Sequence, residues 1–356
     1  MIPTPYVEVN LETLQKNIDA KTRELAERGI AHRPHVKTHK STEIARMQRA
    51  AGAAGITVSK LGEAKVFFDA GFDDILVAYN LVGRDKLDRY AAMHRARRML
   101  TTVDSKEVAE GLDGVGAATG RPVDVLVELN LGEDRCGVPP GMVAEFARML
   151  REYRGLRVVG AMSYHGSIYS CASEEGRARI VEEERDALLA AQGALRAAGF
   201  AADITSAGSS IASRRADLLA GVSEIRCGNY VFNDRNAIAG GAAGVGDCSL
   251  RVAATVISLP APGRATLDAG SKTLSGDRTQ VEGFGLIVGK PNAVIESLNE
   301  EHAMVKANGE PFYFGERVSI VPNHACSVVN LANAIYGFRD GEFAKEFVIE
   351  ARGLYN

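Results

Sequence analysis

The side chains best suited to chemistry in this sequence begin with a cationic segment, Arg-Pro-His-Val-Lys-Thr-His-Lys, at residues 33–40. Pro34 favours extended geometry in Arg33, so the segment is predicted to end a strand. A lysine at a strand-to-helix junction can be desolvated, which lowers its pKa and makes its amine a nucleophile towards an aldehyde. We therefore predict that Lys37 holds pyridoxal phosphate (PLP) as a Schiff base, with His35 close to the cofactor. The alternative is a solvated cationic surface.

Two glycine-containing loops are candidates for a phosphate site. Residues 206–210 and 227–230 follow the seventh and eighth predicted strands, where barrel enzymes commonly bind phosphate. Glycine lets backbone N–H groups approach an anion closely, and a serine can cap the helix that follows. The residues expected to bind the cofactor here are Ser206, Gly208, Ser209, Gly228, Asn229 and Tyr230. Two ordinary strand-to-helix turns are the alternative interpretation.

Two further polar positions follow predicted strands. Arg135 lies among glycines after the fifth strand and could contact an anionic oxygen of a cofactor or substrate. A salt bridge to Glu133 or Asp134 is the other interpretation of Arg135. Tyr164 and His165 follow the sixth strand, where they either face the site or pack at the rim of a barrel.

A possible metal site lies near the C-terminus, in residues 321–326. His324 and Cys326 are two positions apart, so in an extended run their side chains point to the same side. An imidazole and a thiolate form half of a zinc site, and the remaining positions are left for water or substrate. The alternative is a buried thiol without a metal. His302 could lie near this pair, although a surface polar cluster with Glu300 and Glu301 is the preferred interpretation.

The first two thirds of the chain alternate short β-rich runs with stretches long enough for helices. The runs are 31–37, 56–59, 75–78, 100–103, 123–130, 158–163, 203–206 and 224–227. Eight strands that alternate with helices predict an α/β fold, a TIM-type (β/α)8 barrel. We expect this barrel to cover residues 10–239.

The pattern changes after about residue 240, where a glycine-rich stretch precedes β-rich runs separated by turns. The runs are 250–259, 264–268, 283–288, 293–298, 303–306, 318–321 and 347–351. They predict a C-terminal all-β domain over residues 240–356. The alternating residues 6–9 are expected to add a strand from the N-terminal segment 1–9.

The composition of the chain argues against nucleic acid and membranes as binding partners. The net charge of -3 lacks the concentrated basic surface that nucleic acid requires, and no apolar run approaches the roughly 20 residues of a membrane helix. The five cysteines are scattered and odd in number, which favours reduced thiols in the cytoplasm over a disulfide framework. Neither a phosphate-binding P-loop nor a dinucleotide fingerprint is present. A small-molecule substrate is therefore expected.

Four motifs taken together resemble one family. They are RPHVKTHK at 33–40, GNYVF at 228–232, DAGSK at 268–272 and PNHAC at 322–326. In this order, across nearly the whole chain, they resemble the D-threonine aldolase and D-serine dehydratase group of PLP enzymes, which is related in fold to alanine racemase. The resemblance implies a racemase-like barrel, a C-terminal β-domain and a homodimer.

The same resemblance implies roles for individual residues. Lys37 would carry the cofactor, Arg135 would lie near its phenolic oxygen, and Tyr164 near its ring nitrogen. His324 and Cys326 match the metal ligands of the dehydratase branch, whereas aldolases of the group typically have His-x-Asp. Cysteine favours zinc over manganese or magnesium as the divalent metal.

The implied activity is a metal-dependent lyase of 3-hydroxy-D-amino acids. Dehydration to a 2-oxo acid and ammonia is preferred over aldol cleavage to glycine and an aldehyde. A racemase and a non-catalytic PLP-binding protein remain as further alternatives. Residues 164–167 match neither branch of the family, which leaves the choice of substrate open.

Overall fold

The computed structural model describes residues 2–356, which form two compact units. The barrel unit contains Lys21–Lys37, Gln48–Gly228 and Leu354–Asn356. The β unit contains Thr38–Met47 and Asn229–Gly353, together with the N-terminal residues up to Ala20. Two of the five unit boundaries fall directly after Lys37 and directly after Gly228.

The barrel unit is built on one sheet of eight parallel strands, as the sequence predicts. Its strands are β2 (Ala31–His32), β3 (Ile56–Val58), β4 (Ile75–Val77), β5 (Met99–Val103), β6 (Val123–Leu129), β7 (Leu156–Ser163), β8 (Ile204–Ala207) and β9 (Glu224–Ile225). They pair in the order β2-β9-β8-β7-β6-β5-β4-β3. A single parallel bridge, His35 to Thr57, joins the two ends of this order and completes the curl of the sheet.

The two strands at the ends of the barrel prediction are shorter than expected. Strand β2 stops at His32, and residues 36–38 form the 3-10 turn η1 (Val36–Thr38) instead of continuing the strand. Pro34 explains the break because it has no N–H to donate to a ladder. Strand β9 likewise stops at Ile225, two residues before the expected end.

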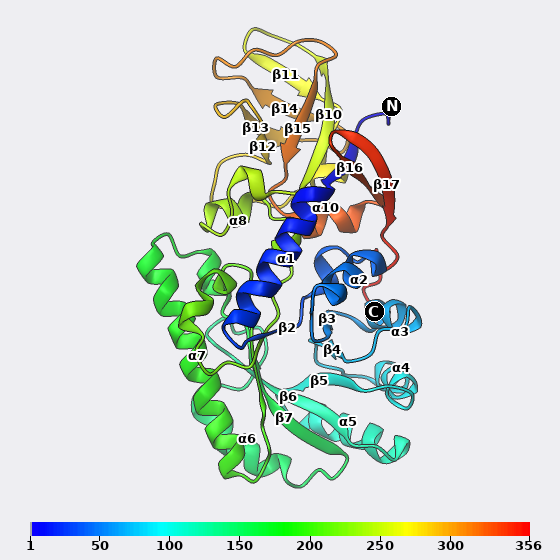
Figure 1. The fold of residues 1–356 in the computed structure, drawn as a ribbon, viewed down its shortest axis with the longest axis vertical. Coiled ribbons are helices and arrows are strands. Elements are labelled where there is room, and N and C mark those ends of the chain that lie inside the picture. The colour runs from blue at the N-terminus through cyan, green and yellow to red at the C-terminus, as the bar shows by residue number, and fades with distance from the viewer. Residues whose placement is uncertain (1) are drawn as a thin grey trace. The chain divides into compact units, whose positions relative to one another are not determined.

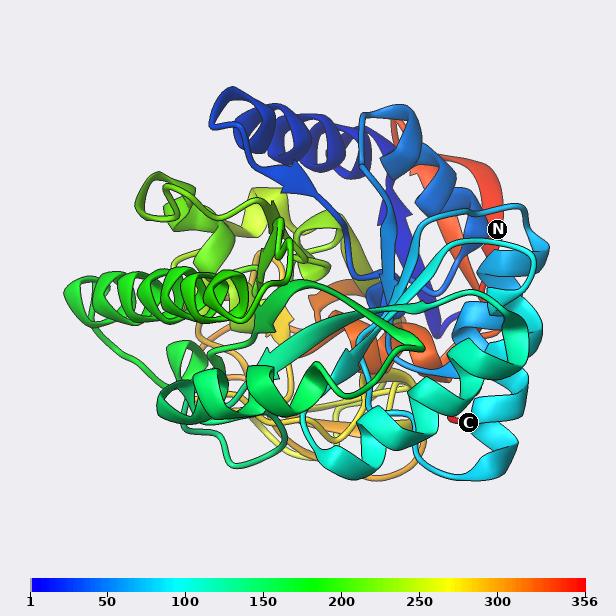
Figure 2. The ribbon, with the colours of Figure 1, turned by 90° about the horizontal axis from the view of Figure 1, so that it is seen from below.

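Helices cover the outer face of this sheet, as Figure 2 shows for the cyan-to-green helices. They are α3 (Leu61–Asp69), α4 (Arg84–His94), α5 (Lys106–Thr119), α6 (Val143–Leu150) and α7 (Glu174–Ala197). Because both faces of the sheet are covered, β6 is buried along all seven residues and has no polar-apolar alternation. Leu76, Leu100, Leu126 and Met162, one from each of four adjacent strands, form a core cluster.

The first helices show how local sequence sets their ends. Helix α1 (Leu11–Glu27) buries Leu14 and Ile18 on one face. The Asn10 side chain caps it by accepting a hydrogen bond from the Thr13 amide at 2.7 Å. Gly29, at a φ of 70°, follows its end in the left-handed region that glycine tolerates. Helix α2 (Thr42–Ala50) follows the η1 turn.

The β unit contains a nine-stranded sheet, drawn in the upper part of Figure 1. Its strands are β1 (Tyr6–Asn10), β10 (Leu250–Ser258), β11 (Arg264–Leu267), β12 (Leu286–Ile287), β13 (Val294–Leu298), β14 (Ala303–Lys306), β15 (Arg317–Val321), β16 (Ala334–Arg339) and β17 (Glu342–Val348). Strand β1 pairs antiparallel with β10 and parallel with β16, which confirms the expected N-terminal strand. Strand β16 was not predicted, and β17 lies mostly before the expected run 347–351.

Short helices complete this unit. They are α8 (Arg235–Ala239), α9 (Ser271–Leu274) and α10 (Ala325–Leu331). No helix among residues 2–356 combines the length and apolar character needed to cross a bilayer.

Candidate active site

Lys37 lies in the η1 turn, just past the carboxyl end of β2. The turn is anchored to β3, since Pro34 O accepts a hydrogen bond from the Thr57 amide at 2.9 Å and Ser59 Oγ lies 3.5 Å from His35 Nε2. Lys37 is exposed although its neighbours Val36 and Thr38 are buried. The desolvation assumed from the sequence is therefore not found at this lysine. An exposed amine on a fixed turn is instead accessible to an aldehyde.

A buried polar network connects the ends of β7, β8 and β9. The Arg226 guanidinium donates to Ser206 O at 2.6 Å, to Ser206 Oγ at 2.7 Å and to Ser163 O at 2.6 Å. Ser206 Oγ in turn donates to Glu224 Oε1 at 2.6 Å. Glu184 on α7 accepts from Ser163 Oγ at 2.9 Å and from the Gly208 amide at 3.1 Å. The Ser206 hydroxyl is therefore engaged in this network below the loop.

Burial sets the electrostatics of the network. It raises the pKa of Glu184 and lowers the pKa of Arg226, since a low-dielectric interior disfavours both charged forms. Sequence reasoning missed both residues. The available signal was a charged pair, Glu224 and Arg226, inside an otherwise apolar strand sequence.

Gly208 lies in the first of the two glycine-containing loops. A Cβ at this position would lie 2.9 Å from Ser163 O and 3.0 Å from Arg226 Nη2, so only glycine lets the loop pack this closely against the end of β7. Ser209 Oγ accepts from the Ala212 amide at 2.9 Å and caps the following turn.

The amides of the two loops fit an anion. Within residues 2–356, the backbone N–H groups of Ser209, Ser210 and Gly228 donate no hydrogen bond. Backbone donors without acceptors, on loops that contain glycine, are suited to a phosphate group. Together with the accessible amine of Lys37, the residues present fit PLP.

Arg135 and Tyr164 lie against each other at the ends of β6 and β7. The Arg135 guanidinium carbon is 5.1 Å from the centre of the Tyr164 ring. Its nitrogens also lie 3.9 Å from Glu128 and 3.8 Å from Glu133, so the expected ion pair to Glu133 is present as well. Burial raises the pKa of Tyr164 to about 12, which keeps its hydroxyl protonated near neutral pH.

In the β unit, His324 and Cys326 begin helix α10. His324 is its N-cap residue and Cys326 lies in its first turn. The expectation of an extended run is therefore wrong, although the two side chains do interact. The charge of Cys326 is the largest cause that raises the pKa of His324 to about 10.

The surroundings of this pair fit a metal with open positions. The Cys326 thiol lies 3.3 Å from Thr38 Oγ1, and Thr38 follows Lys37 directly in the chain. His324 Nδ1 lies 2.7 Å from Asp277 Oδ2, which leaves Nε2 available to a metal. Among residues 2–356 no cluster of three or more His, Cys, Asp or Glu side chains could hold a metal, so His302 does not complete one. A catalytic metal keeps an open coordination position for water or substrate, and a pair of protein ligands leaves such positions.

Asn229 and Tyr230 belong to the turn η5 (Asn229–Val231). The Asn229 amide donates to Asp234 Oδ2 at 2.8 Å, and the same carboxylate accepts from the Ala325 amide at 2.9 Å. Asn229 Oδ1 is buried without a hydrogen-bond partner in the described chain. Tyr230 is also buried. Asp234, which sequence reasoning missed, thus connects this turn to the start of α10.

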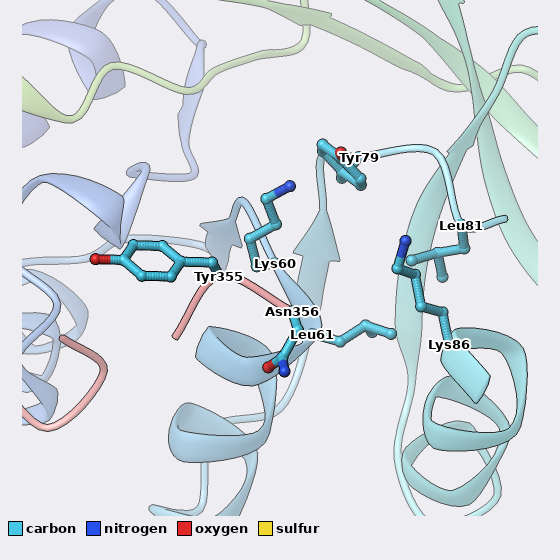
Figure 3. A pocket seen from close by; sticks show the side chains of 7 residues that line it. All are labelled: Lys60, Leu61, Tyr79, Leu81, Lys86, Tyr355 and Asn356. Atoms are coloured by element: carbon cyan, nitrogen blue, oxygen red, sulfur yellow. The ribbon is translucent and has the colours of Figure 1, made fainter. Parts of the chain in front are cut away.

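A cavity of about 170 Å³ lies beyond β3 and β4 (Figure 3) and contains none of the predicted site residues. It is lined by Lys60, Leu61, Tyr79, Leu81, Lys86, Tyr355 and Asn356. Lys60 Nζ is 3.5 Å from the centre of the Tyr79 ring and lowers the pKa of that phenol. The cavity is cationic and lies at the carboxyl ends of the strands.

Comparison with known proteins matches both parts of the chain. A family model described as "Alanine racemase, N-terminal domain" matches residues 9–236, and a serine dehydratase domain matches residues 249–338. The D-threo-3-hydroxyaspartate dehydratase of Delftia sp. (strain HT23) is 34% identical over 348 residues, which is 92% of this chain and 91% of that protein.

Two solved structures resemble the whole chain. The crystal structure of D-threonine aldolase from Filomicrobium marinum has a TM-score of 0.92 and 29% identity, and the match covers 100% of this chain and 97% of that one. A variant of D-threo-3-hydroxyaspartate dehydratase in its metal-free form has a TM-score of 0.91 and 32% identity, with 98% of each chain covered. The alanine-racemase-like match implies PLP, and a metal-free form of a relative fits a metal-dependent family.

Proposed function

This chain belongs to the D-threonine aldolase and D-serine dehydratase family of alanine-racemase-like PLP enzymes, and from that membership we propose a PLP- and metal-dependent lyase of 3-hydroxy-D-amino acids. The favoured reaction is dehydration, which yields a 2-oxo acid and ammonia. The observation that carries this choice is the pair His324 and Cys326 at the start of α10.

The cofactor is assigned to the barrel domain, residues 10–239. When bound there, PLP supplies an electron sink for negative charge that develops at the substrate Cα. Lys37 holds the cofactor and later accepts the proton from Cα, and its exposure on a fixed turn supports this role. The amides of the Gly208 and Gly228 loops bind the phosphate. Arg135 and Tyr164 orient the ring, and the protonated Tyr164 hydroxyl can donate a hydrogen bond.

The metal is assigned to the β-domain, residues 240–356 with the N-terminal segment 1–9. His324 and Cys326 would hold it, and a thiolate ligand favours zinc over manganese or magnesium. A divalent metal at this position supplies Lewis acidity, which makes the β-hydroxyl of the substrate a better leaving group. His324 and Cys326 would therefore place the metal where it can activate the β-hydroxyl, and Cys326, at a position where aldolases of the group typically have aspartate, favours loss of that hydroxyl.

The alternative is the aldolase reaction, in which a base removes the proton of the β-hydroxyl and the Cα–Cβ bond breaks. The same lysine and the same two metal ligands can serve both reactions. A racemase needs no metal at the β-carbon, because it only moves a proton at Cα. A non-catalytic PLP-binding protein needs neither His324 nor Cys326.

Product analysis tests the proposal. The purified protein is given PLP and zinc with D-serine, D-threonine or D-threo-3-hydroxyaspartate, and the 2-oxo acid, ammonia, glycine and aldehyde are measured. We expect 2-oxo acid and ammonia from at least one substrate. Glycine and aldehyde without 2-oxo acid would overturn the dehydratase assignment. The Lys37→Ala variant is the control, and it should lose both the yellow colour of bound PLP and product formation.

We further propose a homodimer located in the cytoplasm. All five cysteines are thiols, not disulfides, which supports a reducing compartment. Light scattering during size-exclusion chromatography tests the oligomeric state, and a monomer at micromolar concentration would contradict it.

A further inference from the structure

Asp277 is a carboxylate beside the candidate metal ligands with no assigned role. It lies in the loop that follows α9, and its Oδ2 accepts from Ser327 Oγ at 2.5 Å and lies 2.7 Å from His324 Nδ1. A carboxylate oxygen accepts hydrogen bonds, and Asp277 Oδ2 already accepts the Ser327 hydroxyl. The 2.7 Å contact therefore pairs this oxygen with an N–H donor at His324 Nδ1.

This contact determines how His324 can bind a metal. With Nδ1–H donated to Asp277, Nε2 is the nitrogen that a metal can bind, and the metal displaces any proton that Nε2 carries. A carboxylate on the far nitrogen of a metal-binding histidine fixes the tautomer and the ring orientation, and it increases the basicity of the ligating nitrogen. The bond to Asp277 therefore has a consequence for the metal that a surface ion pair would lack.

The main chain around Asp277 is attached to the same segment. The buried Asn323 side chain donates to Asp277 O at 2.9 Å and to Gly283 O at 2.9 Å, so the residue before His324 holds both sides of the loop. Asp277 and His324 are thus held together through their main chains as well as through their side chains. An incidental contact between two exposed side chains would not need this support.

We propose that Asp277 is a positioning residue that orients His324 for a divalent metal without being a ligand itself. Its Oδ2 already contacts Nδ1 of His324 and the Ser327 hydroxyl, so the hydrogen-bonding capacity of that oxygen is used within the protein. The inference rests on the proposed function insofar as it takes His324 and Cys326 to be metal ligands. It adds a residue that is 47 positions away from His324 in the chain.

Zinc affinity, measured by competition with a chromophoric chelator, tests the proposal without any activity assay. We expect Asp277→Ala to weaken zinc binding by about 10- to 100-fold, the usual effect of losing such a partner. Asp277→Asn keeps an oxygen acceptor and should recover part of the loss. Ser327→Ala is the comparison variant: it removes a hydroxyl that lies 2.5 Å from Asp277 Oδ2 and 3.3 Å from His324 Nδ1. It leaves the shorter Asp277–His324 contact, so its zinc affinity should stay within about 2-fold of wild type.

Cobalt substitution distinguishes a positioning role from ligation. At saturating cobalt, Asp277→Ala should keep the thiolate-to-cobalt absorption and its band pattern, since Cys326 and His324 still bind. A changed band pattern would make Asp277 a ligand and overturn the proposal, as would wild-type zinc affinity in Asp277→Ala. If the wild-type protein binds no zinc or cobalt, the metal part of the proposed function fails first. That result differs from tight zinc binding by both the wild-type protein and Asp277→Ala, which would overturn only the role of Asp277.

Discussion

Replacing Arg226 by methionine should strongly destabilise the barrel unit. Arg226 is buried, makes three hydrogen bonds to Ser163 and Ser206, and lies near several buried carboxylates. Removal of one partner from a buried charged group typically costs about 3–5 kcal/mol, because the other charges remain uncompensated. In a unit of this size each kcal/mol shifts the unfolding midpoint by about 2–4 °C, so we expect a fall of about 6–20 °C.

The loss of folding stability in Arg226→Met should also depend on pH. Burial raises the pKa values of Glu184 and Glu128, and the charge of Arg226 acts against this rise. Without Arg226 both folded-state values move further above the unfolded value of 4.5. A carboxyl group with a raised folded pKa contributes stability that is present below its unfolded pKa and is lost as pH rises through its folded pKa. The deficit of Arg226→Met should therefore be larger at about pH 8 than at about pH 5.

Calorimetric unfolding of the cofactor-free protein measures both effects, because bound PLP would add its own stabilisation. Arg84→Met is the control: Arg84 is almost fully exposed and forms only a surface ion pair, at 3.6 Å from Asp88. Such pairs contribute about 0–1 kcal/mol. The reasoning is refuted if Arg226→Met unfolds at the same temperature as Arg84→Met. It is also refuted if the loss of stability in Arg226→Met, relative to wild type, does not shrink as pH falls.

Two further outcomes are expected. Gly208→Ala places a Cβ at 2.9 Å from Ser163 O and 3.0 Å from Arg226 Nη2. Such overpacking costs about 1–3 kcal/mol, so the affinity for PLP should fall by up to about 100-fold. If the variant retains as much PLP as wild type after gel filtration, this prediction is wrong. Cys326→Ala removes the thiolate ligand and should weaken zinc binding by more than about 100-fold, beyond the effect of losing an outer partner, as measured by metal analysis after dialysis; zinc retained at the wild-type level would exclude Cys326 as a ligand.

The barrel could be predicted from the sequence because its strands are buried on both faces. Each appears as a short apolar run bounded by turns, and all eight are present. Strand β16 was missed because its residues alternate between buried and partly exposed and include Gly337, which weakens the apolar signal. Strand ends were less accurate, as at β2, where a proline stops the ladder two residues beyond His32.

The site was predictable where function depends on neighbours in the chain. The spacing of His324 and Cys326 indicated that the side chains meet, although a helix start and not an extended run brings them together. Asp277 and Arg226 could not be found in this way. Their partners lie 47 and 63 positions away, and only the fold brings them close. Charged residues in apolar surroundings were the one available sign.

The closure of the barrel beside Lys37 is much weaker than its far side. Strands β6 and β7 are paired over seven residues, whereas the sheet ends share one bridge, His35–Thr57, with backbone hydrogen bonds from the Thr57 amide to Pro34 O and from the Ala54 amide to His32 O. Backbone stretches with few hydrogen bonds open at low free-energy cost, while the rest of a domain stays folded. We therefore expect any local opening of the barrel to begin at this bridge beside Lys37, while the strands opposite keep their order.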